Sequence, residues 1–276
     1  MTIKEQIQHK LIELGSNTIL IHSDLMCGFN IPFSRNKSFL ISHIAELMSL
    51  KKEASIWMPA FNYDFLKGAV FNIEKTPSKV GVLTEHFRKT EAEWRTPIPV
   101  FSFAGIGEQP ILDISETIDP FGLKSAFHHL YINDSILMHY GSTLNSSTIL
   151  HYVERISNRL SYRYDKLFHG KISISNDKEI DVKFNYHVRP LGEHLEYDIN
   201  KIEKDLLENG VLSLFKEGQT RILIAKVTDL TNFWKSKMEQ DSLYFLDNQS
   251  KIWIEPFLDK VGRPFILTDF EKQKEL

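Results

Sequence analysis

The chain has 276 residues, of which 42% are apolar and 25% charged, a composition typical of a globular protein with a sizeable core. Its 33 basic and 36 acidic side chains give a net charge of -3, and this balance argues against nucleic acid as a partner. Charged residues interrupt the apolar stretches before the roughly 20 residues that a membrane helix needs, so we expect no membrane partner.

The cysteine and histidine patterns exclude further classes of protein. Cys27 is the one cysteine of the sequence, so no intramolecular disulfide can form, and CxxC and HExxH motifs are absent. We therefore expect no metal site, and a reducing cytoplasm as the location. Cys27 itself is predicted to be a small buried apolar residue rather than a nucleophile.

Helix and strand patterns alternate through the first half of the chain, as in an α/β layer. Gly15 is typical of a helix C-terminus, and Ser34 of a helix N-cap. The predicted elements are a helix up to residue 14, strands over 18–22 and 55–58, helices over 34–50 and 82–89, a strand over 135–140 and a helix that begins near residue 147.

The second half has a different pattern. Residues 171–188 alternate apolar and polar side chains around Asn176 and Asp177, which predicts an antiparallel hairpin. A second hairpin is predicted over 211–227, after a helix over 198–210. The expected fold class is α/β, with a central mostly mixed sheet, helices on both faces and an antiparallel hairpin-rich C-terminal half. Since no linker interrupts the chain, we expect a single domain over residues 1–276.

The strongest candidate for chemistry lies directly after the strand over 135–140. On the predicted helix, His151 and Glu154 are three residues apart and share a face, so the carboxylate can orient or polarise the imidazole of a general base. An ordinary surface pair is the alternative interpretation. Loops at the carboxyl ends of sheet strands are where α/β folds bind ligands, and this favours the functional interpretation.

A second candidate is the polar segment over residues 21–29, which follows a predicted strand. Backbone N–H groups in this loop, or at the next helix start, are suited to hold a phosphate. The segment contains neither a Walker loop nor the GxGxxG of dinucleotide-binding folds. A plain strand-to-helix connection is the alternative.

Several segments taken in order carry a family resemblance. They are IHS at 21–23, MPAFN at 58–62, TPSKVGVLTEHFR at 76–88, RTPIPVFSFAGIG at 95–107, DPFG at 119–122 and TILHYVE at 148–154. This series resembles the aminoglycoside 3-N-acetyltransferase family over nearly the whole chain. The resemblance implies an α/β fold, an acyl-coenzyme A donor and an amino-sugar acceptor.

The resemblance also implies roles for individual residues. His151 is similar to the family's general base, and Glu154 to the partner that orients it or contacts the amine. Asn145 is counted with them as catalytic, although the family often has Asp there. The residues implied for acyl-coenzyme A are Ser23, Leu25, Met26 and Ser102 along the donor and Ser78, Lys79, Val80 and Gly81 at its phosphates. Those implied for the acceptor are Asn62, Tyr63 and Glu154.

Departures from the family pattern suggest a changed acceptor. Ile98 replaces a usual His and Asn145 an acidic residue, which favours an anionic, nucleotide-linked 3-amino sugar for surface polysaccharide. An aminoglycoside, acetylated to confer antibiotic resistance, is the first alternative. A non-catalytic protein that binds an amino sugar or nucleotide is the second. The expected partners are thus the small acceptor and the acyl-coenzyme A donor, and a homodimer is a further option.

Overall fold

The computed structural model describes residues 1–29, 37–51, 53–115, 117–157, 162–175, 177–191 and 194–271. The predicted helix cap at Ser34 and the predicted turn residue Asn176 lie outside these ranges. None of the described helices combines the length and the apolar composition needed to cross a bilayer.

A mixed sheet forms the centre of the molecule, and its described part has seven strands in the order β4-β5-β2-β1-β6-β10-β9. The pairs β1–β2 and β1–β6 are parallel, whereas the pairs towards both edges are antiparallel. The strands are β1 (Thr18–Ser23), β2 (Ser55–Pro59), β4 (Trp94–Arg95), β5 (Phe103–Ile106), β6 (Ile136–Tyr140), β9 (Ser213–Glu217) and β10 (Thr220–Lys226). The expected fold class is therefore confirmed.

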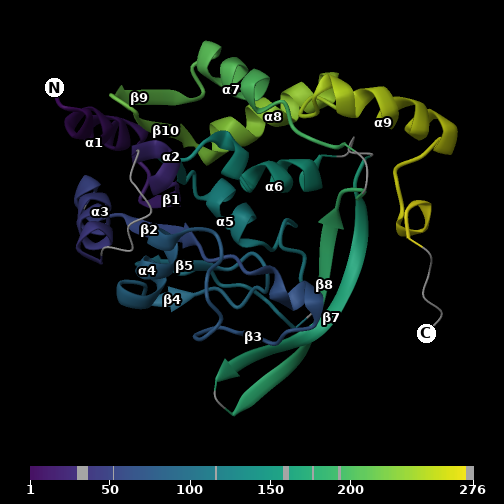
Figure 1. Cartoon of the computed structure of the whole chain (residues 1–276), viewed down its shortest axis with the longest axis horizontal. Helices are drawn as coiled ribbons and strands as arrows, with labels where there is room; N and C mark the ends of the chain where they lie inside the picture. The colour runs from purple at the N-terminus through teal and green to yellow at the C-terminus, as the bar shows by residue number, and fades with distance from the viewer. Residues whose placement is uncertain are drawn as a thin grey trace.

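A second, smaller sheet is built around the hairpin predicted over residues 171–188, whose first strand begins earlier, at Tyr164. Strands β7 (Tyr164–Ser175) and β8 (Lys178–Val188) pair antiparallel, and β3 (Phe71–Asn72) pairs parallel with β7. Figure 1 shows this hairpin running along one side of the molecule, away from the central sheet. The other predicted hairpin is β9 and β10, which extends the central sheet through β6.

Helices cover both faces of the central sheet because its middle strands are apolar on both sides. Along β1, Ile19 and Ile21 pack in a core with Leu11 and Leu47, whereas Leu20 points into the opposite core. The helices are α1 (Ile3–Leu14), α2 (Leu25–Phe29), α3 (Lys37–Leu50), α4 (Val82–Thr90), α5 (Ala126–Ile132), α6 (Ile149–Ile156), α7 (Ile199–Glu208), α8 (Val227–Gln240) and α9 (Asn248–Val261). Helices α1, α3 and α4 contribute to the first core, and α5, α6, α7 and α8 to the second.

Two predictions for the segment after β1 are wrong. The segment is not a loop, because residues 25–29 form the short helix α2, whose first N–H groups are capped by the Asp24 carboxylate. Cys27 is exposed on this helix rather than buried. The Asp24 cap thus stabilises a helix where the sequence led us to expect a loop, and this helix packs beside the carboxyl end of β1.

Candidate active site

The candidate active site is centred on two side chains of α6. His151 Nδ1 lies 2.9 Å from Glu154 Oε2, as the i, i+3 spacing predicts. Helix α6 is amphipathic, and its apolar residues fill the second core, so the two polar residues are carried to the core boundary. The His151 side chain keeps 25% of its exposure, while Glu154 has none. The pair is therefore not an ordinary surface contact.

Glu154 is buried among several donors. The hydroxyls of Tyr162 and Tyr197 donate to Oε1 over 2.6 and 2.8 Å, and Arg163 Nε lies 2.8 Å from Oε2 in an ion pair. Burial alone would raise the pKa of this carboxyl, but Arg163 and the hydrogen bonds of His151 and Tyr162 lower it to about 2. Glu154 is thus an anion throughout the neutral range.

His151 is held as a neutral base by its surroundings. Burial lowers the pKa of the imidazole, the positive charge of Arg163 lowers it further, and Glu154 opposes both effects. An ionised carboxylate only accepts hydrogen bonds, so Nδ1 carries the ring proton towards Glu154. Nε2 therefore keeps its lone pair, which is the arrangement that general-base catalysis requires.

Three residues of this cluster, Tyr162, Arg163 and Tyr197, were not among the residues predicted from the sequence. Tyr162 and Arg163 directly precede β7, and Tyr197 precedes α7, so they follow His151 by between 11 and 46 positions. No local spacing joins them to α6. Their residue types, an arginine and two tyrosines, indicate a role at the site only once the fold shows that they lie beside Glu154.

Two cavities meet at His151. The first, here called the strand-end cavity, has a volume of about 240 Å³ and lies at the carboxyl ends of β1 and β2. The second, the hairpin cavity, has about 430 Å³ and lies against β7 and β8. Both are lined by Asn145, His151, Tyr186 and Tyr197. A donor and an acceptor that occupied one cavity each would meet at the imidazole.

Some residues expected to contact acyl-coenzyme A lie in the strand-end cavity and others do not. Ser23 and Val80 line it, and the buried Ser23 hydroxyl has no hydrogen-bond partner among the described residues, so it is available to a ligand. Leu25 is buried in α2 and Met26 points outward from it. Ser102 is fully buried, where its hydroxyl accepts from Arg95 and donates to the Ala60 carbonyl.

The predicted phosphate-binding groups before α4 already have partners within the protein. The Ser78 N–H donates to Glu85, the Lys79 N–H to the Phe61 carbonyl, and the Lys79 ammonium to Asp64 over 2.6 Å. Gly81 is the residue that precedes α4, and its backbone takes up φ 135°. A phosphate at Lys79 would have to compete with Asp64.

The residues expected to contact the acceptor are also divided. Tyr63 lines the strand-end cavity, whereas Glu154 is fully buried and lines neither cavity. Asn145, which was expected to be catalytic, lines both cavities. Asn62 is buried, and its amide bonds the Pro77 carbonyl and the Asp64 N–H, which shapes the turn that carries Tyr63. Asn62 therefore positions its neighbour in this structure.

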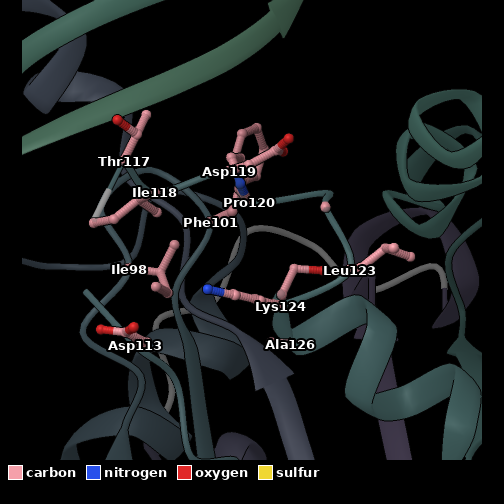
Figure 2. Close-up of a pocket in the computed structure, with 12 residues that line it drawn as sticks. Ile98, Phe101, Asp113, Thr117, Ile118, Asp119, Pro120, Leu123, Lys124 and Ala126 are labelled. Carbon is pink, nitrogen blue, oxygen red and sulfur yellow. The ribbon is translucent and has the colours of Figure 1, made fainter. Parts of the chain in front are cut away.

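Ile98, on which the expectation of a changed acceptor partly rested, lies in another cavity. This cavity has a volume of about 180 Å³, and Figure 2 shows Ile98 and Lys124 on facing sides of it. Phe101 lines both this cavity and the strand-end cavity. His151 lines the strand-end cavity but not this one. Ile98, at the position where the family usually has His, thus lines a cavity that His151 does not line.

Comparison with known proteins decides the family. A family model described as aminoglycoside 3-N-acetyltransferase matches residues 41–239, which is more than two thirds of the chain. The chain belongs to this family. Among curated proteins, none matches the sequence significantly.

Solved structures of aminoglycoside acetyltransferases, and of the YokD protein, have the same fold. The structure "AAC-IIIb binary with CoASH" has a TM-score of 0.68 at 16% identity, over 86% of this chain and 96% of that one. The aminoglycoside acetyltransferase AAC(3)-Xa has a TM-score of 0.67 at 18% identity, over 86% and 92%. The YokD protein from Bacillus subtilis has a TM-score of 0.62 at 20% identity, over 87% and 94%.

Membership of the aminoglycoside 3-N-acetyltransferase family confirms the expected class of enzyme. The chain is an acyl-coenzyme-A-dependent N-acyltransferase, and acyl-coenzyme A is its cosubstrate. The unpartnered buried polar atoms His22 Nε2 and Ser23 Oγ, both on described residues that line the strand-end cavity, fit a polar ligand there.

Proposed function

We propose that the acceptor is an amine of an aminoglycoside-type amino sugar, acetylated directly from acetyl-coenzyme A, a reaction that would confer antibiotic resistance. The observation that carries this proposal is the neutral His151, hydrogen-bonded to Glu154, at the junction of two cavities. In this arrangement the donor occupies the strand-end cavity beside Ser23 and Val80. The acceptor occupies the hairpin cavity.

The family description favours an aminoglycoside over the nucleotide-linked sugar that the sequence led us to expect. Solved structures of similar fold include an enzyme bound to sisomicin and others in complex with apramycin and with a gentamicin. In this chain, Glu196 and Glu271 line the hairpin cavity and are suited to receive protonated amines. Its aromatic walls offer flat apolar surface to sugar rings.

A nucleotide-linked amino sugar remains a second candidate because of two cations in the same cavity. Lys166 and Arg189 line it, as a diphosphate would require. However, Lys166 pairs with Glu271 and Arg189 with Glu196, so a phosphate would have to displace a carboxylate at each site. An amine would likewise have to displace Lys166 or Arg189 from these carboxylates, so the ion pairs do not separate the two candidates, and the family description is what makes the anionic acceptor the weaker one.

The proposed reaction is a single direct transfer. His151 Nε2 removes a proton from the acceptor ammonium, and the free amine then attacks the thioester carbonyl carbon. A carbon–nitrogen bond forms, and the carbonyl electron pair moves to oxygen. When the oxyanion collapses, the carbon–sulfur bond breaks, and the protonated His151 gives its proton to the leaving thiolate. The regenerated imidazole then takes the second proton of the attacking nitrogen and passes it to solvent, so a neutral amide, a free thiol and one released proton result. Glu154 holds the imidazole in place and stabilises its positive charge during this cycle.

Thiol release measures this proposal directly. The purified chain is mixed with acetyl-coenzyme A and one of apramycin, sisomicin, gentamicin or a nucleotide-linked 3-amino sugar, and the acetylated product is identified by mass spectrometry. We expect faster release with an aminoglycoside. Faster release with the nucleotide-linked sugar would favour the second candidate. Binding of coenzyme A or sugar without release in any mixture would support the non-catalytic alternative.

A further inference from the structure

Two tyrosine hydroxyls in the strand-end cavity have no role in the reaction described so far. Tyr63 lies in the 3-10 helix η1 (Tyr63–Lys67), and Tyr186 lies on β8. The two residues are far apart in the chain, and the fold brings both to one cavity. Both line the cavity beside His151, and Tyr186 also lines the hairpin cavity. Tyr186 therefore stands where donor and acceptor would meet.

The two phenol rings are fixed by one buried aromatic residue. Phe101 is 3% exposed, and its ring centroid lies 6.0 Å from that of Tyr63 and 5.3 Å from that of Tyr186, with both contacts edge-on. Phe121 lies 6.5 Å from Tyr186 and 5.5 Å from His151 by the same measure. Tyr186 is thus held by packing against several rings, whereas Tyr63 is 41% exposed and is held on one side by Phe101.

The hydroxyls of Tyr63 and Tyr186 have no hydrogen-bond partner among the described residues, whereas those of Tyr162 and Tyr197 bond Glu154. Burial, and then the neighbouring Tyr186, raises the pKa of Tyr63 to about 12, and burial also raises the pKa of Tyr186. Both phenols therefore keep their protons at neutral pH and act as donors.

Three backbone N–H groups at this end of the cavity are not available for the same task. The N–H groups of Ser147, Thr148 and Leu150 already donate to carbonyls within the chain, at 2.9 to 3.1 Å. Acyl transfer needs donors for the negative charge that develops on the thioester oxygen. Unpartnered side-chain hydroxyls are the donors that the cavity offers.

We propose that the hydroxyls of Tyr63 and Tyr186 together bind the carbonyl oxygen of the acyl thioester and stabilise the oxyanion formed from it. This inference rests on the acyl-transfer function. During attack, the amine nitrogen bonds to the carbonyl carbon and the carbonyl electron pair moves to oxygen. The two O–H groups donate hydrogen bonds to that oxygen without losing their protons. Collapse of the oxyanion restores the carbonyl and expels the thiolate.

Single-atom deletions test this role in steady-state kinetics. Tyr63→Phe and Tyr186→Phe each remove one hydroxyl and keep the ring packing, and each is expected to lower kcat about 10²-fold. The KM values for acetyl-coenzyme A and the acceptor should stay within about threefold, because the contact strengthens in the transition state. The control Tyr131→Phe, whose hydroxyl bonds Asn232 outside both cavities, should keep the wild-type kcat. An unchanged kcat with a raised acceptor KM would overturn the proposal.

A measurement without any acceptor tests the role of the two tyrosines independently of which sugar is acetylated. The carbonyl stretch of bound acetyl-coenzyme A, labelled with carbon-13 at the carbonyl, is recorded by infrared difference spectroscopy. The wild type should shift the band to lower wavenumber, and the double variant Tyr63→Phe/Tyr186→Phe should lose the shift. Equal bands in both proteins would refute the oxyanion role even if an aminoglycoside is acetylated. A shifted band without acetylation of any sugar would instead contradict the proposed acceptors.

Discussion

Glu154 carries a full charge inside the core, and this single feature sets the properties of His151. Several donors stabilise the carboxylate, so the imidazole receives a fixed anionic partner on Nδ1. The nearby Arg163 limits how far that anion raises the basicity of the ring. The result is an imidazole that is neutral at physiological pH and oriented with its lone pair free.

The pH dependence of kcat/KM should reflect this balance. Because the pKa of His151 is lowered, the acid limb in the wild type should have its midpoint below pH 6.5. Glu154→Gln removes the charge that raises this pKa and leaves Arg163 in place, so the midpoint should move to still lower pH and kcat should fall.

Tyr162→Phe is the matched control for that measurement, since it removes one hydrogen bond to Glu154 without changing its charge. Its acid limb should move less than that of Glu154→Gln. A midpoint that rises in Glu154→Gln would show that the carboxylate does not act on the imidazole as described.

At the scale of elements, a close backbone contact links α2 to the residue after β6. A Cβ on Gly28 would lie 2.0 Å from the Gly141 Cα, a backbone atom that cannot move aside. Gly28→Ala should therefore lower the free energy of unfolding by about 1–3 kcal/mol and weaken binding of acetyl-coenzyme A beside Ser23. Urea unfolding and calorimetry check both effects.

Gly262→Ala is a useful comparison, because a Cβ there meets nothing within 4 Å and only the left-handed backbone (φ 67°) is strained. Its cost should be about 1–2 kcal/mol, with no effect on coenzyme binding. Normal acetyl-coenzyme A binding by Gly28→Ala would mean that α2 does not shape the strand-end cavity.

The elements with long, regular patterns were predictable from sequence, and the short ones were not. The apolar run of β1 and the alternation around residues 171–188 are local signals, so β1 and the hairpin are confirmed, although β7 begins seven residues earlier than predicted. Strands β3 and β4 have two residues each and exist only because of the partners beside them. Helix α2 depends on the Asp24 cap, and the sequence around Asp24 was interpreted as a loop.

For the whole molecule, the sequence predicted the class of fold and the contact between His151 and Glu154, but not how the cavities are completed. His151 and Glu154 share one helix, so their spacing sufficed. Tyr186 reaches the site through the pairing of a second sheet, and Tyr197 through a segment before α7. Such contacts depend on sheet order and register, which no local pattern encodes.

Stability should fall as the solution becomes acidic, because several imidazoles are buried in neutral form. Burial lowers the pKa of His22 to about 4 and lowers that of His139 well below its usual value. Below pH 6.5 the unfolded chain takes up protons that the folded chain does not, so stabilisation present above pH 6.5 is lost towards pH 4. For His22 this loss is roughly 3 kcal/mol.

Urea unfolding at pH 7.5, 6.0 and 5.0 measures this effect. His22→Phe, which keeps a ring stacked against His139, should show a weaker dependence on pH over the same range. A free energy of unfolding that stays constant or rises between pH 7.5 and pH 5.0 would contradict the neutral burial of these histidines.

The most direct test of the account is the turnover number of His151→Asn. We expect kcat for acetyl transfer to fall by about 10²- to 10⁴-fold, while the circular dichroism spectrum and the affinity for acetyl-coenzyme A stay unchanged. His169→Asn, an exposed histidine on β7, should keep the wild-type kcat. A His151→Asn enzyme that turns over at the wild-type rate would show that the reaction does not use this imidazole as its base.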